Sequence, residues 1–119
     1  MSLNPFPTPS PLERVLLKEL VNVAGLCYRR GWTYGTAGNF SLRGSNGLIW
    51  QSPSGLNKGN LDPSGFIPVD LITGSPVNPN PGKASLEMPV HLAIYRAVHA
   101  AKAVVHVHSP AFVKASRNG

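Results

Sequence analysis

Apolar residues recur at the spacing of an α-helix near the start of the chain. Ser10, Pro11 and Glu13 form a capping-box pattern and Gly31 is a helix stop, so the sequence predicts a packing helix over residues 11–30. Residues 1–10 are rich in proline and are expected to form a flexible arm. The predicted apolar face makes Cys27 a core residue rather than a nucleophile, and it comprises Leu12, Val15, Leu16, Leu20, Val23, Leu26 and Cys27.

Strand patterns follow this helix. Residues 39–43 and 48–52 flank Asn46-Gly47, a strong signal for a tight hairpin turn. Residues 66–71 are predicted to form another strand, in which Pro68 marks an edge or a bulge.

A second helix is expected to begin near Met88, because Pro89 suits a first helical turn. Its predicted apolar face is Val90, Ile94 and Val98, together with Leu92 or Ala93 and with Ala97. Ser85 and Glu87 lie just before it, where either could be a simple cap; Ser85 could also offer its hydroxyl to an anion, and Glu87 could pair with His91.

The segment after this helix, residues 103–108, is predicted to be a buried strand that ends in two histidines. Side chains of a strand alternate between faces, so His106 and His108 point the same way and could both bind one metal ion. Ser109-Pro110 would then start a helix. The alternative is that one histidine caps the strand and the other is exposed.

Two loops combine small residues, hydroxyl groups and glycines. The first is Thr36-Ala37-Gly38-Asn39, and the second, residues 52–59, contains Ser54, Gly55 and Lys58. Exposed backbone N–H groups and hydroxyls of this kind bind anions, although plain turns have the same composition. Because the loops follow opposite ends of a hairpin strand, they are not expected to meet one ligand directly unless the sheet curves.

Composition narrows the function classes. The 119 residues suffice for one domain, and 11 Lys and Arg against 5 Asp and Glu give a net charge of +6. This charge suits a phosphorylated small molecule; a nucleic-acid partner is not favoured, because the basic residues form no run beyond Arg29-Arg30. Cys27 is the only cysteine, which fits a reducing, cytoplasmic setting. No apolar run is long enough to span a membrane, and the N-terminus has no signal-peptide pattern.

Four stretches resemble, in order, the motifs of the class II aldolase/adducin family. They are GTAGNFSLR (35–43), SPSGLNKGNL (52–61), KASLEMPVHLAIYR (83–96) and AVVHVHSP (103–110). The resemblance extends over residues 12–113 and implies an α/β fold with a mainly antiparallel central sheet flanked by helices. Residues 11–119 would form the N-terminal part of such a domain, incomplete at the C-terminus.

The resemblance also implies roles for individual residues. His106 and His108 would be two of three ligands for zinc, or for another divalent metal. Glu87 matches the residue that serves as catalytic acid/base in the family's aldolase branch. The positions that match the family's phosphate-binding residues are Thr36, Gly38, Asn39, Ser54, Gly55 and Ser85.

Within the family, residues 30–43 and the following loop are most like the methylthioribulose-1-phosphate dehydratase branch, which removes water from a phosphorylated ketose in methionine salvage. The alternatives are a fuculose-phosphate-type aldolase and a non-catalytic domain like the adducin head. The family's third zinc histidine and the acid/base residue of the dehydratase branch are both expected downstream of His108, so the chain is expected to be truncated. Leu86 stands where the aldolase branch has a second serine. By analogy, the protein is expected to be a homo-oligomer, a tetramer in this family.

Overall fold

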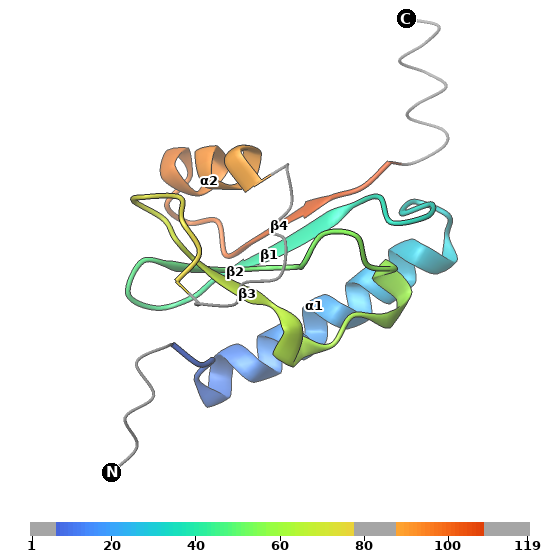
Figure 1. Ribbon diagram of the computed structural model, residues 1–119, viewed down its shortest axis with the longest axis horizontal. Helices are drawn as coiled ribbons and strands as arrows, with labels where there is room; N and C mark the ends of the chain where they lie inside the picture. The colour runs from blue at the N-terminus through green and yellow to red at the C-terminus, as the bar shows by residue number, and fades with distance from the viewer. Residues whose placement is uncertain (1–6, 78–87, 109–119) are drawn as a thin grey trace, which may run out of the picture.

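The computed structural model describes residues 7–77 and 88–108 of the chain (Figure 1). Two helices, α1 (Pro11–Arg29) and α2 (Met88–Ala97), accompany four strands and two short 3-10 helices. The strands are β1 (Asn39–Arg43), β2 (Leu48–Gln51), β3 (Ile67–Asp70) and β4 (Ala103–His106), and the 3-10 helices are η1 (Lys58–Asn60) and η2 (Pro63–Gly65).

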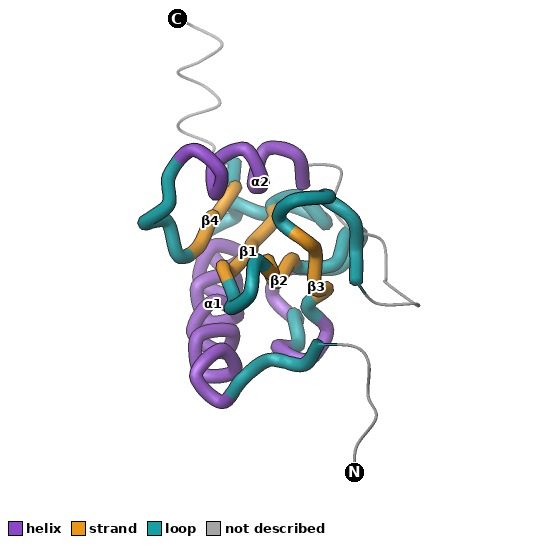
Figure 2. Tube along the Cα trace, turned by 90° about the vertical axis from the view of Figure 1, so that its left-hand side faces the viewer, coloured by secondary structure: helices purple, strands orange, loops and turns teal. Residues whose placement is uncertain are grey.

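The strands form one antiparallel sheet in the order β3-β2-β1-β4, with a helix on each face (Figures 1 and 2). This arrangement confirms the predicted α/β fold. None of the helices in the described ranges is long and apolar enough to cross a membrane.

Side chains along β1 point alternately to the two faces of the sheet, and each face packs on its own layer of the core. Phe40 and Leu42 face α1 and join the core around Leu17, Ala24 and Trp50. The opposite face of the sheet packs on α2 through Ile49, Ile67, Val69, Met88, Leu92 and Tyr95. The polar residues of β1 therefore face α2, which determines where the polar groups of that helix must lie.

Local signals in the sequence explain where α1 begins and ends. Ser10 and Glu13 form the predicted capping box, and Gly31, with φ +75°, follows the helix in the left-handed conformation of a helix stop. Glu13 also accepts a hydrogen bond from the Ser45 backbone N–H at 2.8 Å. Burial alone would raise the pKa of Glu13, but the N–H groups of Ser10 and Ser45 outweigh it and lower this pKa.

The hairpin turn also forms as predicted. Asn46 and Gly47 have φ values of 57° and 74°, and the Leu48 N–H donates to the Ser45 carbonyl, as in a type I′ turn. Pro68 lies on β3, an edge strand of the described sheet, as its missing N–H requires.

The predicted faces of both helices are partly wrong. On α1, the buried stripe runs through Leu17, Leu20, Ala24 and Cys27, whereas Leu12, Val15, Val23 and Leu26 are exposed. On α2, Val90 and Ile94 are exposed, as is Val98 just after the helix, and Met88, His91, Leu92 and Tyr95 are buried. Each helix carries two apolar stripes, and the side chains of the sheet decide between them. For α2, the polar face of β1 draws His91 and Tyr95 inward.

The prediction that residues 103–108 form a buried strand is also wrong. The strand ends at His106, and Val105 is 43% exposed. β4 is an edge strand that pairs only with β1 among the described strands, so it has a protein neighbour on one side only.

Candidate functional site

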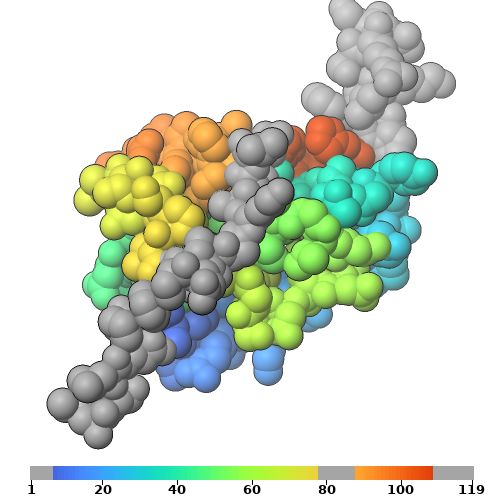
Figure 3. All heavy atoms as spheres, in the orientation of Figure 1, coloured from blue at the N-terminus to red at the C-terminus, as the bar shows by residue number. Residues whose placement is uncertain are grey.

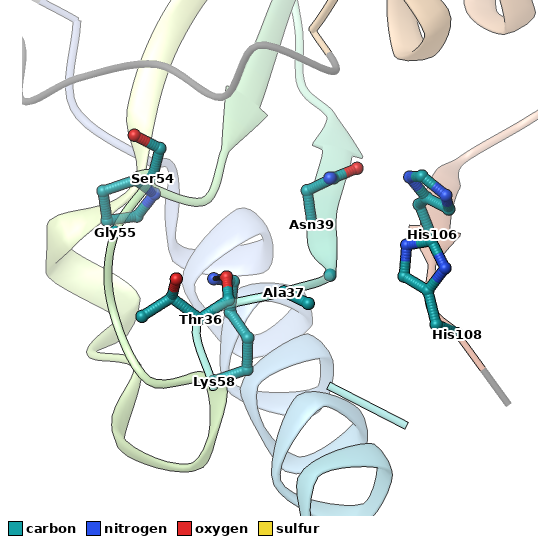
Figure 4. Close-up of a pocket in the computed structure, with 10 residues that line it drawn as sticks. Thr36, Ala37, Asn39, Ser54, Gly55, Lys58, His106 and His108 are labelled. Carbon is teal, nitrogen blue, oxygen red and sulfur yellow. Dashed lines mark hydrogen bonds between the residues drawn. The ribbon is translucent and has the colours of Figure 1, made fainter. Parts of the chain in front are cut away.

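A cavity of about 310 Å³ lies where β1 begins and β2 and β4 end (Figure 4). The lining residues come from three segments of the chain, 36–39, 53–58 and 106–108. Figure 3 shows these segments side by side at one end of the molecule. The residues that line the cavity are Thr36, Ala37, Gly38, Asn39, Pro53, Ser54, Gly55, Lys58, His106 and His108. All candidate site residues that the structure describes therefore lie together.

The two small-residue loops both line this cavity, which corrects the expectation that they could not meet one ligand directly. β1 and β2 are antiparallel, so the start of one strand lies beside the end of the other. Ser52 fixes this junction: its N–H donates to the Phe40 carbonyl at 2.8 Å, and its hydroxyl accepts from the Phe40 N–H at 3.0 Å. The hairpin therefore brings the loops to the same edge of the sheet.

Lys58 connects the two loops. Its Nζ donates hydrogen bonds of 2.8 Å to the carbonyl of Thr36 in the first loop and to that of Leu56 in the second. The side chain is only 1% exposed, and burial lowers its pKa. No carboxylate within residues 7–77 and 88–108 forms an ion pair with it. A buried cation in such a position favours an anionic ligand.

Gly38 allows the first loop to approach the histidine strand. Its φ is +88°, and a Cβ atom there would lie 2.6 Å from Thr33 Cγ2 and 3.3 Å from the His106 carbonyl oxygen. Only glycine satisfies both the left-handed backbone and the close approach. Gly38 is also a predicted phosphate-binding residue, and the structure adds this steric reason for a glycine at the position.

His106 and His108 lie side by side, as the alternation of a strand predicts. Their ring centroids are 4.9 Å apart and their planes are inclined by 49°. Zinc–nitrogen distances of about 2.1 Å at a near-tetrahedral angle place the centroids of two bound imidazoles about 5 Å apart. The spacing therefore fits two ligands of one metal ion, although the described residues contain no cluster of three or more metal-binding side chains.

Glu87 and Ser85, predicted as acid/base and phosphate ligand, lie outside the described residues, as do Ser109 and Pro110. The alternative in which Glu87 pairs with His91 has less support, since both ring nitrogens of His91 are engaged by residues of β1.

A buried polar cluster, which the sequence-based predictions missed, lies behind the cavity. His91 Nε2 bonds to Asn39 Oδ1, and His91 Nδ1 lies 2.6 Å from Ser41 Oγ, which is 2.8 Å from Tyr95 Oη. Burial first, and then the charge of His106, lower the pKa of His91 to about 4, and burial raises the pKa of Tyr95 to about 12. The signal for this cluster was present in the alternation of β1, which aligns its polar residues toward α2.

Known proteins are similar to this chain in sequence and in fold. The family model for the class II aldolase and adducin N-terminal domain matches residues 18–118. A methylthioribulose-1-phosphate dehydratase from Sorangium cellulosum is 37% identical over 99 residues, which cover 83% of this chain and 46% of that protein. The match confirms the resemblance to the family and to its dehydratase branch.

Two solved structures have the same fold. YgbL from Escherichia coli, described as a putative aldolase/epimerase/decarboxylase, aligns with a TM-score of 0.73 and 37% identity, over 82% of this chain and 46% of that one. L-fuculose-1-phosphate aldolase from Thermus thermophilus aligns with a TM-score of 0.63 and 34% identity, over 80% and 47%. The chain thus spans about half the length of the relatives it matches.

Proposed function

The chain belongs to the class II aldolase and adducin family, and we propose that its cavity is the phosphate-binding and metal-binding part of a lyase site for a phosphorylated ketose. The observation that carries this proposal is the convergence of two small, hydroxyl-bearing loops, the buried cation of Lys58 and a histidine pair on one cavity. The substrate would place its phosphate between the loops and its ketose oxygens toward the histidines.

The phosphate would be held by hydrogen bonds from backbone N–H, hydroxyl and amide groups rather than by charged side chains at the surface. We assign this role to Thr36, Gly38, Asn39, Ser54 and Gly55, together with Ser85. Lys58 donates to a carbonyl of each loop, and these two hydrogen bonds fix the distance between the loops. Its positive charge would lie close to the bound anion.

His106 and His108 would hold a divalent metal, with zinc the first choice because imidazole suits it. When bound, the metal would supply Lewis acidity toward the carbonyl and hydroxyl oxygens of the ketose. We assign Glu87 as the residue that moves a proton on or off the substrate, the role of its counterpart in the aldolase branch.

We propose dehydration of methylthioribulose 1-phosphate or a close analogue, as the name of the Sorangium cellulosum relative suggests. The runner-up is carbon–carbon cleavage, which the aldolase from Thermus thermophilus supports. The remaining alternative is a non-catalytic domain like the adducin head. We further propose a cytoplasmic homo-oligomer, tetrameric as is usual in the family.

The test is to incubate the zinc-loaded chain with methylthioribulose 1-phosphate and with fuculose 1-phosphate, and to follow both by mass spectrometry. Loss of one water from the first supports the dehydratase, and splitting of the second into two fragments supports the aldolase. The His106→Ala/His108→Ala variant should abolish either reaction, and His99→Ala should not. If neither compound changes while phosphate and zinc still bind, the non-catalytic alternative replaces the lyase.

A further inference from the structure

His91 is an unusual residue to find at the centre of a helix–sheet interface. It is 0% exposed, on the inner face of α2, and both of its ring nitrogens bond to side chains of β1. One of these partners, Asn39, is 5% exposed and lines the cavity. The buried imidazole of His91 therefore contacts Asn39, which also lines the candidate phosphate site.

The direction of each hydrogen bond in this cluster follows from the chemistry of the groups. The Asn39 Oδ1 atom can only accept, so His91 Nε2 carries a proton and donates it. Burial disfavours a second proton on the ring, which leaves Nδ1 as an acceptor for the Ser41 hydroxyl. Ser41 Oγ is then free to accept from the Tyr95 hydroxyl.

The cluster is therefore ordered in one direction, from Tyr95 through Ser41 and His91 to Asn39. Its final bond engages the oxygen of the Asn39 amide. The NH₂ group is on the other side of the same planar amide, and in Figure 4 Asn39 lies between the Ser54–Gly55 loop and His106.

We infer that His91 is a positioning residue that holds the Asn39 amide with its NH₂ group toward the cavity, so that the site accepts anions and rejects ligands that donate hydrogen bonds at this point. The inference rests on the proposed function for the identity of the anion, phosphate. The reverse amide orientation would present an oxygen atom to the cavity and would repel a phosphate.

A second anchor keeps α2 in the register that this role requires. Arg43 donates from Nε to the Ala101 carbonyl at 2.8 Å and from Nη2 to the Tyr95 carbonyl at 2.6 Å, at the C-terminal end of the helix. Its guanidinium also lies 5.0 Å from the centroid of the Tyr95 ring. Alternate residues of one strand, Asn39, Ser41 and Arg43, thus all contact α2 or the connection that follows it.

The first test is the tautomer of His91 in the wild-type chain, read from long-range ¹H–¹⁵N NMR spectra. We expect a neutral ring with its proton on Nε2. A proton on Nδ1 would mean that the Asn39 amide is reversed. A doubly protonated ring at pH 7 could not accept the hydrogen bond from Ser41, so the series of hydrogen bonds from Tyr95 to Asn39 would be broken. Either result overturns the inference.

The second test compares two substitutions by titrating inorganic phosphate. His91→Gln keeps a donor near the Nε2 position, whereas His91→Asn keeps only an acceptor near Nδ1 and is too short to reach Asn39. Both should cost similar folding stability, but only His91→Asn should weaken phosphate binding, by about tenfold or more. Asn39→Asp should abolish binding, and His99→Gln, an exposed control, should change nothing.

Equal phosphate affinity in His91→Gln and His91→Asn would contradict the inference, because a merely structural histidine gives that result. If the wild-type chain binds no phosphate while the proton is on Nε2, the proposed function fails and the assigned orientation of Asn39 stands.

Discussion

Asn39 and His106 are direct partners across the antiparallel β1–β4 ladder. Residues in such a pair lie on the same face of the sheet, with Cβ atoms about 5 Å apart. Asn39, a candidate phosphate ligand, and His106, a candidate metal ligand, are therefore fixed relative to each other by the backbone hydrogen bonds of this ladder. A ketose 1-phosphate, in which the carbonyl carbon is next to the carbon that carries the phosphate, would fit two groups held this close together.

Lys58 should determine the affinity of the cavity for anions. Replacing it by methionine removes the buried charge and the link between Thr36 and Leu56, so phosphate should bind about tenfold or more weakly. Lys18→Met, which removes an exposed lysine from α1, is the matched control for net charge. Isothermal titration with phosphate measures both variants, and equal affinities would show that Lys58 does not face the anion.

The same residue predicts the effect of alkaline pH. Burial lowers the pKa of Lys58, so its charge is lost as pH rises through that lowered value, before an ordinary lysine with a pKa of 10.5 deprotonates. Phosphate affinity should therefore decrease with rising pH earlier than in a site built on surface lysines. The decrease should be absent from Lys58→Arg if that variant folds, because arginine stays charged.

Gly38 and Gly55 should respond differently to substitution by alanine. Both have positive φ values, +88° and +78°, but a Cβ atom at Gly55 would meet nothing within 4 Å. Gly55→Ala should cost about 1 kcal/mol of backbone strain. Gly38→Ala should cost about 2 kcal/mol or more, since Thr33 must also move. Urea unfolding gives both values, and equal losses would argue against the close packing beneath the loop.

His91 should make folding stability depend on pH in a defined range. Its pKa is about 4 in the folded chain against 6.5 when unfolded, so below pH 6.5 the unfolded state binds a proton that the folded state does not. Stability should therefore fall as pH drops from about 6.5 to about 4, by about 3 kcal/mol in total.

This slope should be absent from His91→Gln, which cannot titrate. Urea unfolding of both proteins at a series of pH values makes the comparison. If the wild-type chain and His91→Gln lost the same stability as the pH fell, His91 would not be the neutral, buried group that gives rise to the slope.

Much of the fold was predictable because its signals are local. The capping box at Ser10 and Glu13, the Asn46-Gly47 turn and the spacing of His106 and His108 each depend on a few neighbouring residues. The helix faces were not predictable in the same way. Val90, Ile94 and Val98 form as good an apolar stripe as the one that α2 buries, and the choice depends on the polar side chains of a strand about fifty residues earlier.

The same distinction between local signals and long-range packing holds for the candidate site. The residues of the two loops were identified by composition, but their meeting at one edge depends on the pairing of β1 with β2. Lys58 was noted only as a lysine near the second loop, because its burial and its contacts with Thr36 and Leu56 arise from packing. His91 was considered only as a possible partner of Glu87, whereas its partners in the structure come from β1.

The most direct measurement is the ³¹P relaxation of inorganic phosphate bound to the chain in the presence of Co²⁺, a paramagnetic substitute for zinc. If the loops and the histidine pair form one site, the wild-type chain should strongly increase the relaxation rate above that of a protein-free sample. The increase should vanish in His106→Ala/His108→Ala and persist in His99→Ala. If the wild-type chain binds phosphate but its relaxation is the same in the double variant, the two halves of the cavity do not form one site, and the proposed function is wrong.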